Sequence, residues 1–514
     1  MLNRRAFLQL MAASGGVAMT GSELLSRAAA NAAPSVSAGG SGGIEHVVVV
    51  MMENRSFDHM LGWLPDARGR TDLVFPAPDG NFYPNYPLAP DFQGCGYSDP
   101  DHSWEGWLLQ HNFGRMDGFL LDPTTPPTLP GVTRAAANTF PIGFYTNLNP
   151  DGTPKAVPDL PVLGALAENY TVLDNYFCSF AGETFPNRLY QHAARTDRDH
   201  NLTKFSHLPN IWDQLSPIPN NKGIPTGGYF FRNEPFLLIF GFNYIPFWHL
   251  FGPGDFDVFG IPVPAQNKSF LDTVAAGELP NVSFVDPEFA LADNGTGGDD
   301  HPLSDVRRGE RFLADIYHAL ASAGYLDNTV LVITFDEWGG FYEHVRPPQV
   351  IDDTDPATVD HTGNSTTPTD GQLVPDYTQL GFRVPAIVVS NQASARVVHS
   401  GPFEHTSTLK MIESVFRLNS ITARDANALD LGQVLRRPAQ TVPQSAIPTS
   451  SEVPGPTTDA AAVCSISSVQ SISPAPVPVP GKGVVSAGRL VAPTRNGFAA
   501  LSHQYGKSSS TART

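Results

Sequence analysis

A short apolar run that ends abruptly in two polar residues most constrains the fold of this chain. Residues 46–52 read HVVVVMM and are followed by Glu53 and Asn54. A run this short and this rich in valine is typical of a strand that is buried on both faces of a sheet. Open α/β sheets bind their ligands at the carboxyl ends of such strands. Glu53 and Asn54 therefore either form part of a site or simply begin a polar turn.

A second apolar strand ends in the same way. Residues 329–335 are fully apolar apart from two threonines and are followed by Asp336 and Glu337. An amphipathic helix predicted over residues 304–323 precedes this strand, and Gly324 ends the helix. A helix followed closely by an apolar strand is the pattern of a βαβ unit. Further strands are predicted over residues 171–176, 281–285 and 384–390, and helices over residues 158–170, 186–194 and 404–418.

Composition narrows the class of protein. The chain has 514 residues, which is enough for one large domain with insertions or for two domains. Its 46 glycines and 47 prolines indicate many long loops. The formal net charge of −18 argues against a nucleic-acid partner and against anchoring to anionic lipid. It leaves a zwitterionic lipid headgroup possible as a ligand.

Three cysteines, Cys95, Cys178 and Cys464, occur in the chain. An odd number leaves at least one thiol free or paired with another molecule. A chain of this length is not expected to depend on a disulfide framework, and no two of the cysteines have the spacing of a metal site.

Residues 1–33 have the features of an export signal. Arg4 and Arg5 precede an apolar stretch, and the alanines at 28–33 offer a small-residue cleavage site. This pattern resembles a twin-arginine signal, with an ordinary secretory signal or a retained anchor as alternatives. We therefore expect the twin-arginine translocation machinery to export the protein to the periplasm, the cell surface or the medium. Residues 34–43 form a flexible Gly/Ser leader.

The rest of the chain divides by composition. Residues 44–437 carry the strand and helix patterns and are expected to form the catalytic domain. Residues 438–514 are rich in Pro, Ser and Thr and are expected to be a loosely structured extension, with a few strands considered near 483–491. Residues 236–252 read FLLIFGFNYIPFWHLFG, without a formal charge. They are either buried core or an aromatic surface that meets acyl chains or a membrane.

A set of polar residues ends strands or lies in glycine-rich loops. Carboxylates on neighbouring strand ends repel one another unless they share a cation. Oxygen ligands with imidazoles nearby suit Zn²⁺, Mn²⁺ or Ca²⁺, and such a cation activates a hydroxyl beside it. The set is Glu53, Asn54, His102, Thr184, Asp300, His301, Asp336, Glu337, His344 and His405.

Thr184 is the hydroxyl of this set. It lies just ahead of the helix predicted to follow Pro186. The free N–H groups at such a position favour an anion, so Thr184 is a candidate nucleophile beside a phosphoryl group. The alternative is a structural N-cap threonine.

Four motifs together resemble one family. They are ENRSFD at 53–58, GETFPNR at 182–188, DHP at 300–302 and FDEWGGFYEHV at 335–345. In this combination and order, the stretch over residues 44–418 is similar to the bacterial phosphoesterase family. That family includes the non-haemolytic and mycobacterial-type phospholipases C and a group of acid phosphatases.

The resemblance implies an alkaline-phosphatase-like fold, in which three α/β/α layers contain a mixed, mostly parallel sheet with long loop insertions. It also implies a divalent metal ion and a covalent phosphothreonine formed on Thr184. His405 matches the family only loosely, at the start of a helix. The implied metal ligands are Glu53, Asn54, Thr184, Asp336 and Glu337. The histidines implied to line the phosphoryl pocket are His102, His301 and His344.

Two positions bear on the branch of the family. Acid phosphatase relatives have serine where this chain has Thr184, which favours the phospholipase C branch. Glu183 stands where those phospholipases have proline, which leaves the substrate class open.

The leading hypothesis is a secreted, metal-dependent phosphoric ester hydrolase of the phospholipase C type. Its substrates would be phosphatidylcholine-like phospholipids, cleaved to diacylglycerol and a phosphorylated headgroup, with peripheral contact to a membrane. Trp104, Trp107 and Tyr145 are candidates to enclose a quaternary ammonium group or to pack in the core. The alternatives are an acid phosphatase, which is a phosphomonoesterase with the same site, and a surface binding protein without catalysis.

Overall fold

The computed structural model describes residues 43–121, 138–290, 295–362, 374–435, 441–457, 464 and 474–477. The predicted export signal, the leader and the strands considered near 483–491 lie outside these residues. Among the helices that the structure describes, none has the length and hydropathy that a membrane crossing requires.

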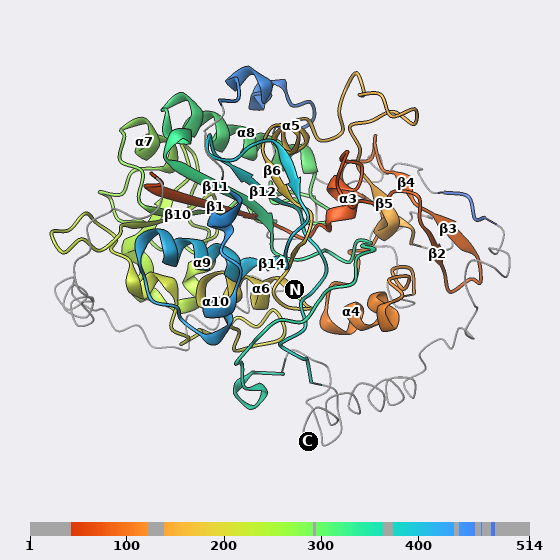
Figure 1. Ribbon diagram of the computed structural model, residues 1–514, viewed down its shortest axis with the longest axis horizontal. Coiled ribbons are helices and arrows are strands. Elements are labelled where there is room, and N and C mark those ends of the chain that lie inside the picture. Colours follow the sequence, from red (N-terminus) through yellow and green to blue (C-terminus); the bar gives the residue numbers. More distant parts are fainter. Residues whose placement is uncertain are drawn as a thin grey trace.

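A sheet of eight described strands forms the centre of the molecule (Figure 1). β12 pairs antiparallel with both of its neighbours, and the other strand pairs of this sheet are parallel. The strands are, in spatial order, β13 (Arg396–Val398), β6 (Thr171–Leu173), β12 (Ala386–Val389), β11 (Thr329–Phe335), β1 (His46–Met52), β10 (Val282–Val285), β8 (Gly227–Phe231) and β9 (Trp248–Leu250).

β1 and β11 lie side by side in the middle of this sheet. All residues of β11 and all but the first of β1 are buried, as expected for apolar strands covered on both faces. Their parallel register pairs Met52 with Phe335. Glu53 and Asp336 therefore leave the sheet next to each other, at the same edge.

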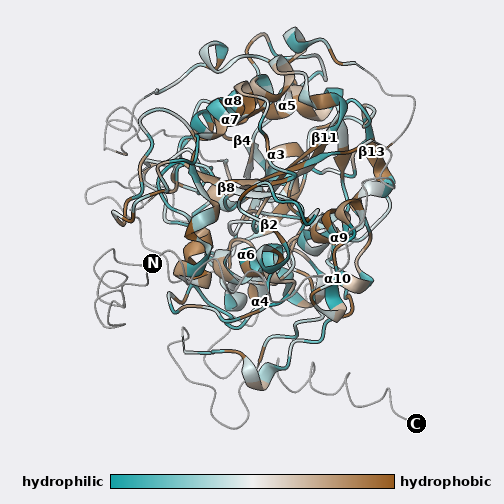
Figure 2. Cartoon of the chain, turned by 90° about the vertical axis from the view of Figure 1, so that its left-hand side faces the viewer, coloured by the Kyte–Doolittle hydropathy of each residue, from teal (hydrophilic) through white to brown (hydrophobic). Residues whose placement is uncertain are grey.

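Helices cover both faces of the sheet (Figures 1 and 2). The mixed, mostly parallel sheet between helix layers confirms the fold class that the resemblance predicted. One face carries α5 (Pro161–Asn169), α7 (Phe270–Ala275) and α8 (Val306–Ser322), and the other carries α6 (Thr184–Ala193), α9 (His405–Phe416) and α10 (Ala423–Asn427).

Capping explains where two of these helices begin. The Asp305 side chain accepts a hydrogen bond from the Arg307 N–H, so α8 starts at Val306. α6 starts at Thr184, with Glu183 at its N-cap, and not at Pro186. Thr184 is therefore the first helical residue, and the N-cap interpretation of Thr184 is wrong.

Long connections carry the smaller elements. Between β1 and α5 lie α3 (Phe57–Leu61), β2 (Val74–Pro76), β3 (Phe82–Pro84), β4 (Tyr86–Pro87), α4 (Trp104–His111) and β5 (Gly143–Phe144), and β7 (Tyr176–Phe177) pairs with β14 (Phe403–Glu404) beyond the main sheet. The 3-10 helices are η1 (Asn112–Gly114), η2 (Phe140–Ile142), η3 (Ile211–Gln214), η4 (Phe236–Phe240), η5 (Phe242–Phe247), η6 (Tyr325–Asp327), η7 (Pro356–Thr358), η8 (Leu431–Val434), η9 (Gln444–Ala446) and η10 (Ser450–Glu452). η4 is buried, as the core interpretation predicts, whereas Phe242 of η5 is 43% exposed.

Part of the C-terminal extension packs on the domain. Arg311 of α8 donates hydrogen bonds to the carbonyls of Val453 and Pro456, each at 2.6 Å. Cys464 forms a disulfide with Cys95, 369 residues away in the sequence. Composition predicted a loosely structured extension, so both contacts correct that expectation, and the pairing of Cys95 with Cys464 was not predicted. Cys178 is free and buried, which confirms that at least one thiol is unpaired.

Candidate active site

The ends of β1 and β11 bring four predicted metal ligands together. Glu53, Asn54, Asp336 and Glu337 are all buried. Asn54 adopts a positive φ of 57°, and its N–H donates to Asp336 Oδ1 at 2.8 Å. The N–H of Glu337 donates to the same oxygen at 2.7 Å. Asp336 Oδ1 thus accepts hydrogen bonds from residues at the ends of both strands.

Two side-chain oxygens of these four residues have no hydrogen-bond partner among the described residues. Asn54 donates its side-chain N–H to Glu337, and Gly339 N–H donates to the other Glu337 oxygen at 2.7 Å. Asn54 Oδ1 and Asp336 Oδ2 are buried and accept no hydrogen bond within the described part of the chain. A buried polar atom left without a partner costs about 1–3 kcal/mol. These residues therefore fit a divalent cation, which would take up both oxygens.

Burial and mutual repulsion disfavour the ionised forms of the carboxylates at this site. Burial raises the pKa of Glu53 well above its ordinary value, and Asp336 raises it further. Burial also raises the pKa of Glu337, with His102 acting in the opposite direction. A cation among these oxygens would favour their ionised forms.

Helix α6 places a hydroxyl and a guanidinium against Glu53. Thr184 Oγ1 donates to Glu53 Oε2 at 3.1 Å. Arg188, one helical turn later on the same face, donates from Nε to Glu53 Oε1 at 2.8 Å. Arg188 also pairs with Asp286, at the end of β10, at 3.1 Å. Arg188 and Asp286 had no predicted role, although the PNR motif contained Arg188.

Two predicted histidines lie at the other side of Glu337. His102 Nε2 is 4.0 Å from Glu337 Oε1, and the rings of His102 and His301 have centroids 6.2 Å apart. Asp99, which had no predicted role, lies 3.8 Å from His301 Nε2. Burial opposes a charge on His102, but Glu337 and Asp99 outweigh burial and raise its pKa to about 10. The spacing of Asp99, His102 and His301 could itself hold a metal ion.

The match to a family decides the class of enzyme. The model of the Phosphoesterase family matches residues 44–223 and 255–419. This chain belongs to the phosphoesterase family. It is therefore a phosphoric ester hydrolase, as the resemblance predicted.

Curated relatives of this phosphoesterase carry phospholipase C names. It is 30% identical over 410 residues to non-specific phospholipase C6 of Arabidopsis thaliana, covering 76% of this chain and 72% of that one. It is 31% identical over 429 residues to phospholipase C B of Mycobacterium tuberculosis H37Rv, covering 76% of this chain and 77% of that one.

Solved structures resemble the phosphoesterase only distantly. Phosphonate monoester hydrolase of Agrobacterium radiobacter gives a TM-score of 0.33 at 10% identity, over 76% of this chain and 77% of that one. A protein of the alkaline phosphatase superfamily from Vibrio parahaemolyticus gives 0.24 at 8% identity, over 84% and 81%. The fold is therefore defined by the eight-stranded mixed sheet of this chain.

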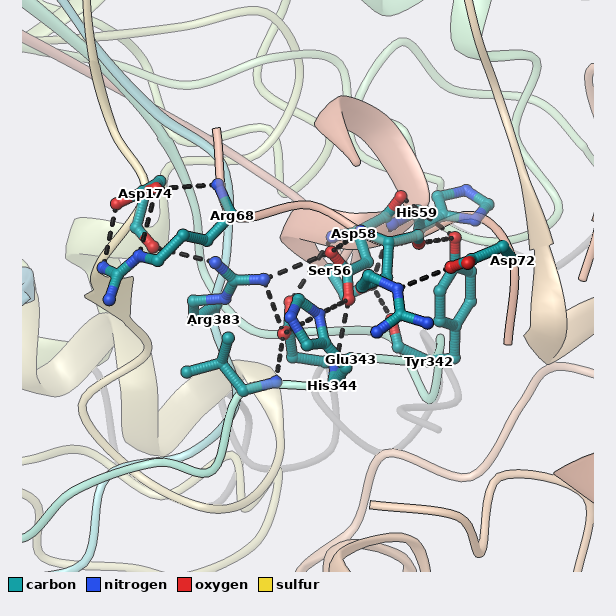
Figure 3. Close-up of polar contacts among 12 residues, drawn as sticks. Ser56, Asp58, His59, Arg68, Asp72, Asp174, Tyr342, Glu343, His344 and Arg383 are labelled. Carbon is teal, nitrogen blue, oxygen red and sulfur yellow. Dashed lines mark hydrogen bonds and ion pairs between the residues drawn. The ribbon is translucent and has the colours of Figure 1, made fainter. Parts of the chain in front are cut away.

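His344 lies in a different group from the one predicted. Its Nδ1 is 2.5 Å from Asp58 Oδ2 and 3.6 Å from Glu343 Oε1, and both carboxylates also contact Arg383 (Figure 3). Asp58, Glu343 and Arg383 are completely buried. Among the described residues, the ion pairs of the His344 ring are with Asp58 and Glu343, so its place in the phosphoryl pocket stays a prediction. Asp58, Glu343 and His344 could also hold a metal ion by spacing, although Arg383 already pairs with both carboxylates.

Two other residues of the predicted set, His405 and Asp300, contact the backbone of Asp336 and helix α8 respectively. His405 is buried, and burial lowers its pKa to about 4, so the neutral ring donates from Nε2 to the carbonyl of Asp336 at 2.8 Å. Asp300 lies against α8, since a Cβ placed on Gly309 would come within 2.1 Å of Asp300 Oδ1.

The aromatic residues considered for a quaternary ammonium group are buried. Trp107 stacks on His111 with ring centroids 4.5 Å apart, and Trp104 is 8% exposed. Tyr145 is fully buried and donates to the carbonyl of Asp91. Their burial favours the core-packing role.

Proposed function

We propose that this phosphoesterase is a secreted phospholipase C that cleaves phosphatidylcholine-like lipids to diacylglycerol and a phosphorylated headgroup. The observation that carries the proposal is the hydroxyl of Thr184, which lies against Glu53 beside two buried oxygens without partners. The phospholipase C names of the relatives from Arabidopsis and Mycobacterium support the substrate class.

The proposed metal ligands are Glu53, Asn54, Thr184, Asp336 and Glu337, and Zn²⁺, Mn²⁺ and Ca²⁺ all suit this donor set. When bound, such a cation lowers the pKa of a hydroxyl beside it and offsets the charge of a phosphoryl group. The side chains of the protein then bind and orient the substrate and move its protons.

In the proposed reaction the Thr184 oxygen attacks phosphorus and gives its proton to Glu53 Oε2, the acceptor of its hydrogen bond. The bond between phosphorus and the diacylglycerol oxygen breaks, and that oxygen takes a proton from His102. The raised pKa of about 10 keeps His102 protonated at neutral pH, so it is able to donate. His301 donates a hydrogen bond to a phosphoryl oxygen. Water then attacks phosphorus and gives a proton to His102, the bond between phosphorus and the Thr184 oxygen breaks, that oxygen takes back the proton held by Glu53, and the phosphorylated headgroup is released.

Export by the twin-arginine pathway belongs to the same proposal. The disulfide between Cys95 and Cys464 supports it, because such bonds persist in oxidising compartments outside the cytosol. Contact with a lipid surface is supported by Phe242, which is 43% exposed and packs on Phe205 with ring centroids 5.7 Å apart.

A phosphomonoesterase is the second candidate, since the same nucleophile and oxygens would serve a monoester. The test compares p-nitrophenyl phosphate with p-nitrophenyl phosphorylcholine and phosphatidylcholine, together with metal analysis of the purified protein. Turnover of the two choline esters well above that of the monoester is expected. A strong preference for the monoester would overturn the phospholipase assignment, and no turnover of any ester with various divalent metals would favour a binding protein.

A further inference from the structure

The residues on both sides of Thr184 are held by one asparagine from a separate loop. The backbone N–H of Asn201 donates to Glu183 Oε2 at 2.5 Å. The side-chain oxygen of Asn201 accepts the N–H of Phe185 at 2.7 Å. Asn201 thus holds the residue before Thr184 through its backbone and the residue after Thr184 through its side chain.

This arrangement replaces the usual cap of a helix. The first N–H groups of a helix have no partner within it and are commonly satisfied by the N-cap side chain. Glu183 occupies the N-cap of α6, but its side chain caps no N–H of α6. Pro186 has no N–H to offer, so Asn201 caps the first turn from 16 residues further along the chain.

We propose that Asn201 and Glu183 are positioning residues that fix the Thr184 hydroxyl for attack on phosphorus. This inference rests on the proposed role of Thr184 as the nucleophile. It also gives Glu183, the residue that departs from the motif of related phospholipases, a specific task. The Glu183 carboxylate accepts a hydrogen bond that proline could not accept.

The loop that carries Asn201 also contacts helix α4. His200 Nδ1 lies 2.7 Å from Asp199 Oδ1, and His200 Nε2 lies 3.6 Å from Glu105 of α4. Helix α4 begins after the N-cap Ser103, next in sequence to His102. The loop therefore connects the turn that presents Thr184 with the helix that follows His102.

Loss of the Asn201 side chain should affect the rate more than the binding of substrate. Without its acceptor, the Phe185 N–H has no described partner, and the peptide groups around Thr184 are free to reorient. Displacement of a reacting group by about 1 Å can cost on the order of 100-fold in rate. The proposed metal ligands at the ends of β1 and β11 are unchanged, so substrate binding should be nearly preserved.

The test uses the full-length, metal-loaded enzyme with p-nitrophenyl phosphorylcholine. Asn201→Ala is expected to lower kcat by about 10- to 100-fold, with KM changed by less than about threefold. Asn201→Asp keeps the acceptor oxygen and should restore most of kcat. Glu183→Gln likewise keeps an acceptor for the Asn201 N–H and should exceed Glu183→Ala in kcat.

Asn210→Ala is the matched control, because Asn210 caps η3 by accepting the Trp212 N–H at 3.0 Å, away from Thr184. It should lower the melting temperature and leave kcat unchanged. Any of three results would reject the positioning role. The first is wild-type kcat in Asn201→Ala, and the second is an equal loss of kcat in Asn201→Ala and Asn210→Ala. The third is no recovery of kcat in Asn201→Asp. Thr184→Ala separates the two proposals, because activity in that variant would reject the nucleophile itself. An inactive Thr184→Ala together with a fully active Asn201→Ala would reject only the positioning role.

Discussion

Replacement of Arg188 by methionine should destabilise the protein strongly when no metal is bound. Arg188 is completely buried and pairs with Glu53 and Asp286, which are 4% exposed each. Methionine fills a similar volume but leaves both carboxylates buried without their cation. Breaking a buried ion pair by removing one partner costs about 3–5 kcal/mol. We expect a loss of this size in the free energy of unfolding, measured by urea titration in the presence of a chelator.

The same titration with a divalent metal supplies the internal check. The cation would compensate Glu53, so the loss caused by Arg188→Met should be smaller in the metal-loaded protein. Arg70→Met is the control, because the Arg70–Asp72 pair is largely exposed and such pairs contribute about 0–1 kcal/mol. An unchanged free energy of unfolding for Arg188→Met in chelator would refute the idea that Arg188 stabilises the acidic cluster.

Three further outcomes are expected. Chelation should lower the melting temperature of wild-type protein more than that of Asp336→Asn, because a ligand bound only by the folded state stabilises it. Cys464→Ser should lower the free energy of unfolding by about 2–4 kcal/mol under oxidising conditions and abolish its sensitivity to a thiol reductant. Burial raises the pKa of Glu310 to about 8, so the folded state retains the proton of Glu310 while the unfolded state ionises near 4.5. The free energy of unfolding should therefore fall as the pH rises between these two values. Glu310→Gln should flatten this part of the profile of stability against pH.

The ends of β1 and β11 could be predicted because they depend on local pattern. Each strand is an apolar run that stops at two polar residues, and parallel strands bring their carboxyl ends to one edge of a sheet. Adjacent pairing of the two strands then places Asn54 and Asp336 in hydrogen-bond contact. The proposed role of Thr184 came from the resemblance of its motif to the family, since the local sequence pattern alone also allowed a structural N-cap.

The residues around that core could not be predicted from local pattern. Arg188 lies in the GETFPNR motif, but its two carboxylate partners follow β1 and β10, which are distant in the sequence. Asn201 reaches the turn at Thr184 through the path of a loop that no periodicity describes. Asp99 reaches His301 in the same way.

The contacts of His344 follow the sharp turn after Glu337. Gly339 and Gly340 both adopt positive φ, 63° and 72°, so the chain turns sharply after Glu337. A Cβ at Gly339 would come within 1.9 Å of the Asn54 carbonyl, so only glycine fits there. Beyond this turn, His344 Nδ1 lies 2.5 Å from Asp58 Oδ2.

The contacts of this turn also explain why the first motif continues beyond Asn54. Ser56 Oγ donates to the Tyr342 carbonyl at 2.6 Å and caps α3 by accepting the His59 N–H. Asp58 accepts the His344 N–H at 3.0 Å. The first two residues of the ENRSFD motif thus face the candidate metal site, and Ser56 and Asp58 hold the segment that follows Glu337. The proposed ligands on β1 and β11 would have to keep a fixed separation to share one cation, so loss of Asp58 should disturb the candidate site although Asp58 lies outside it.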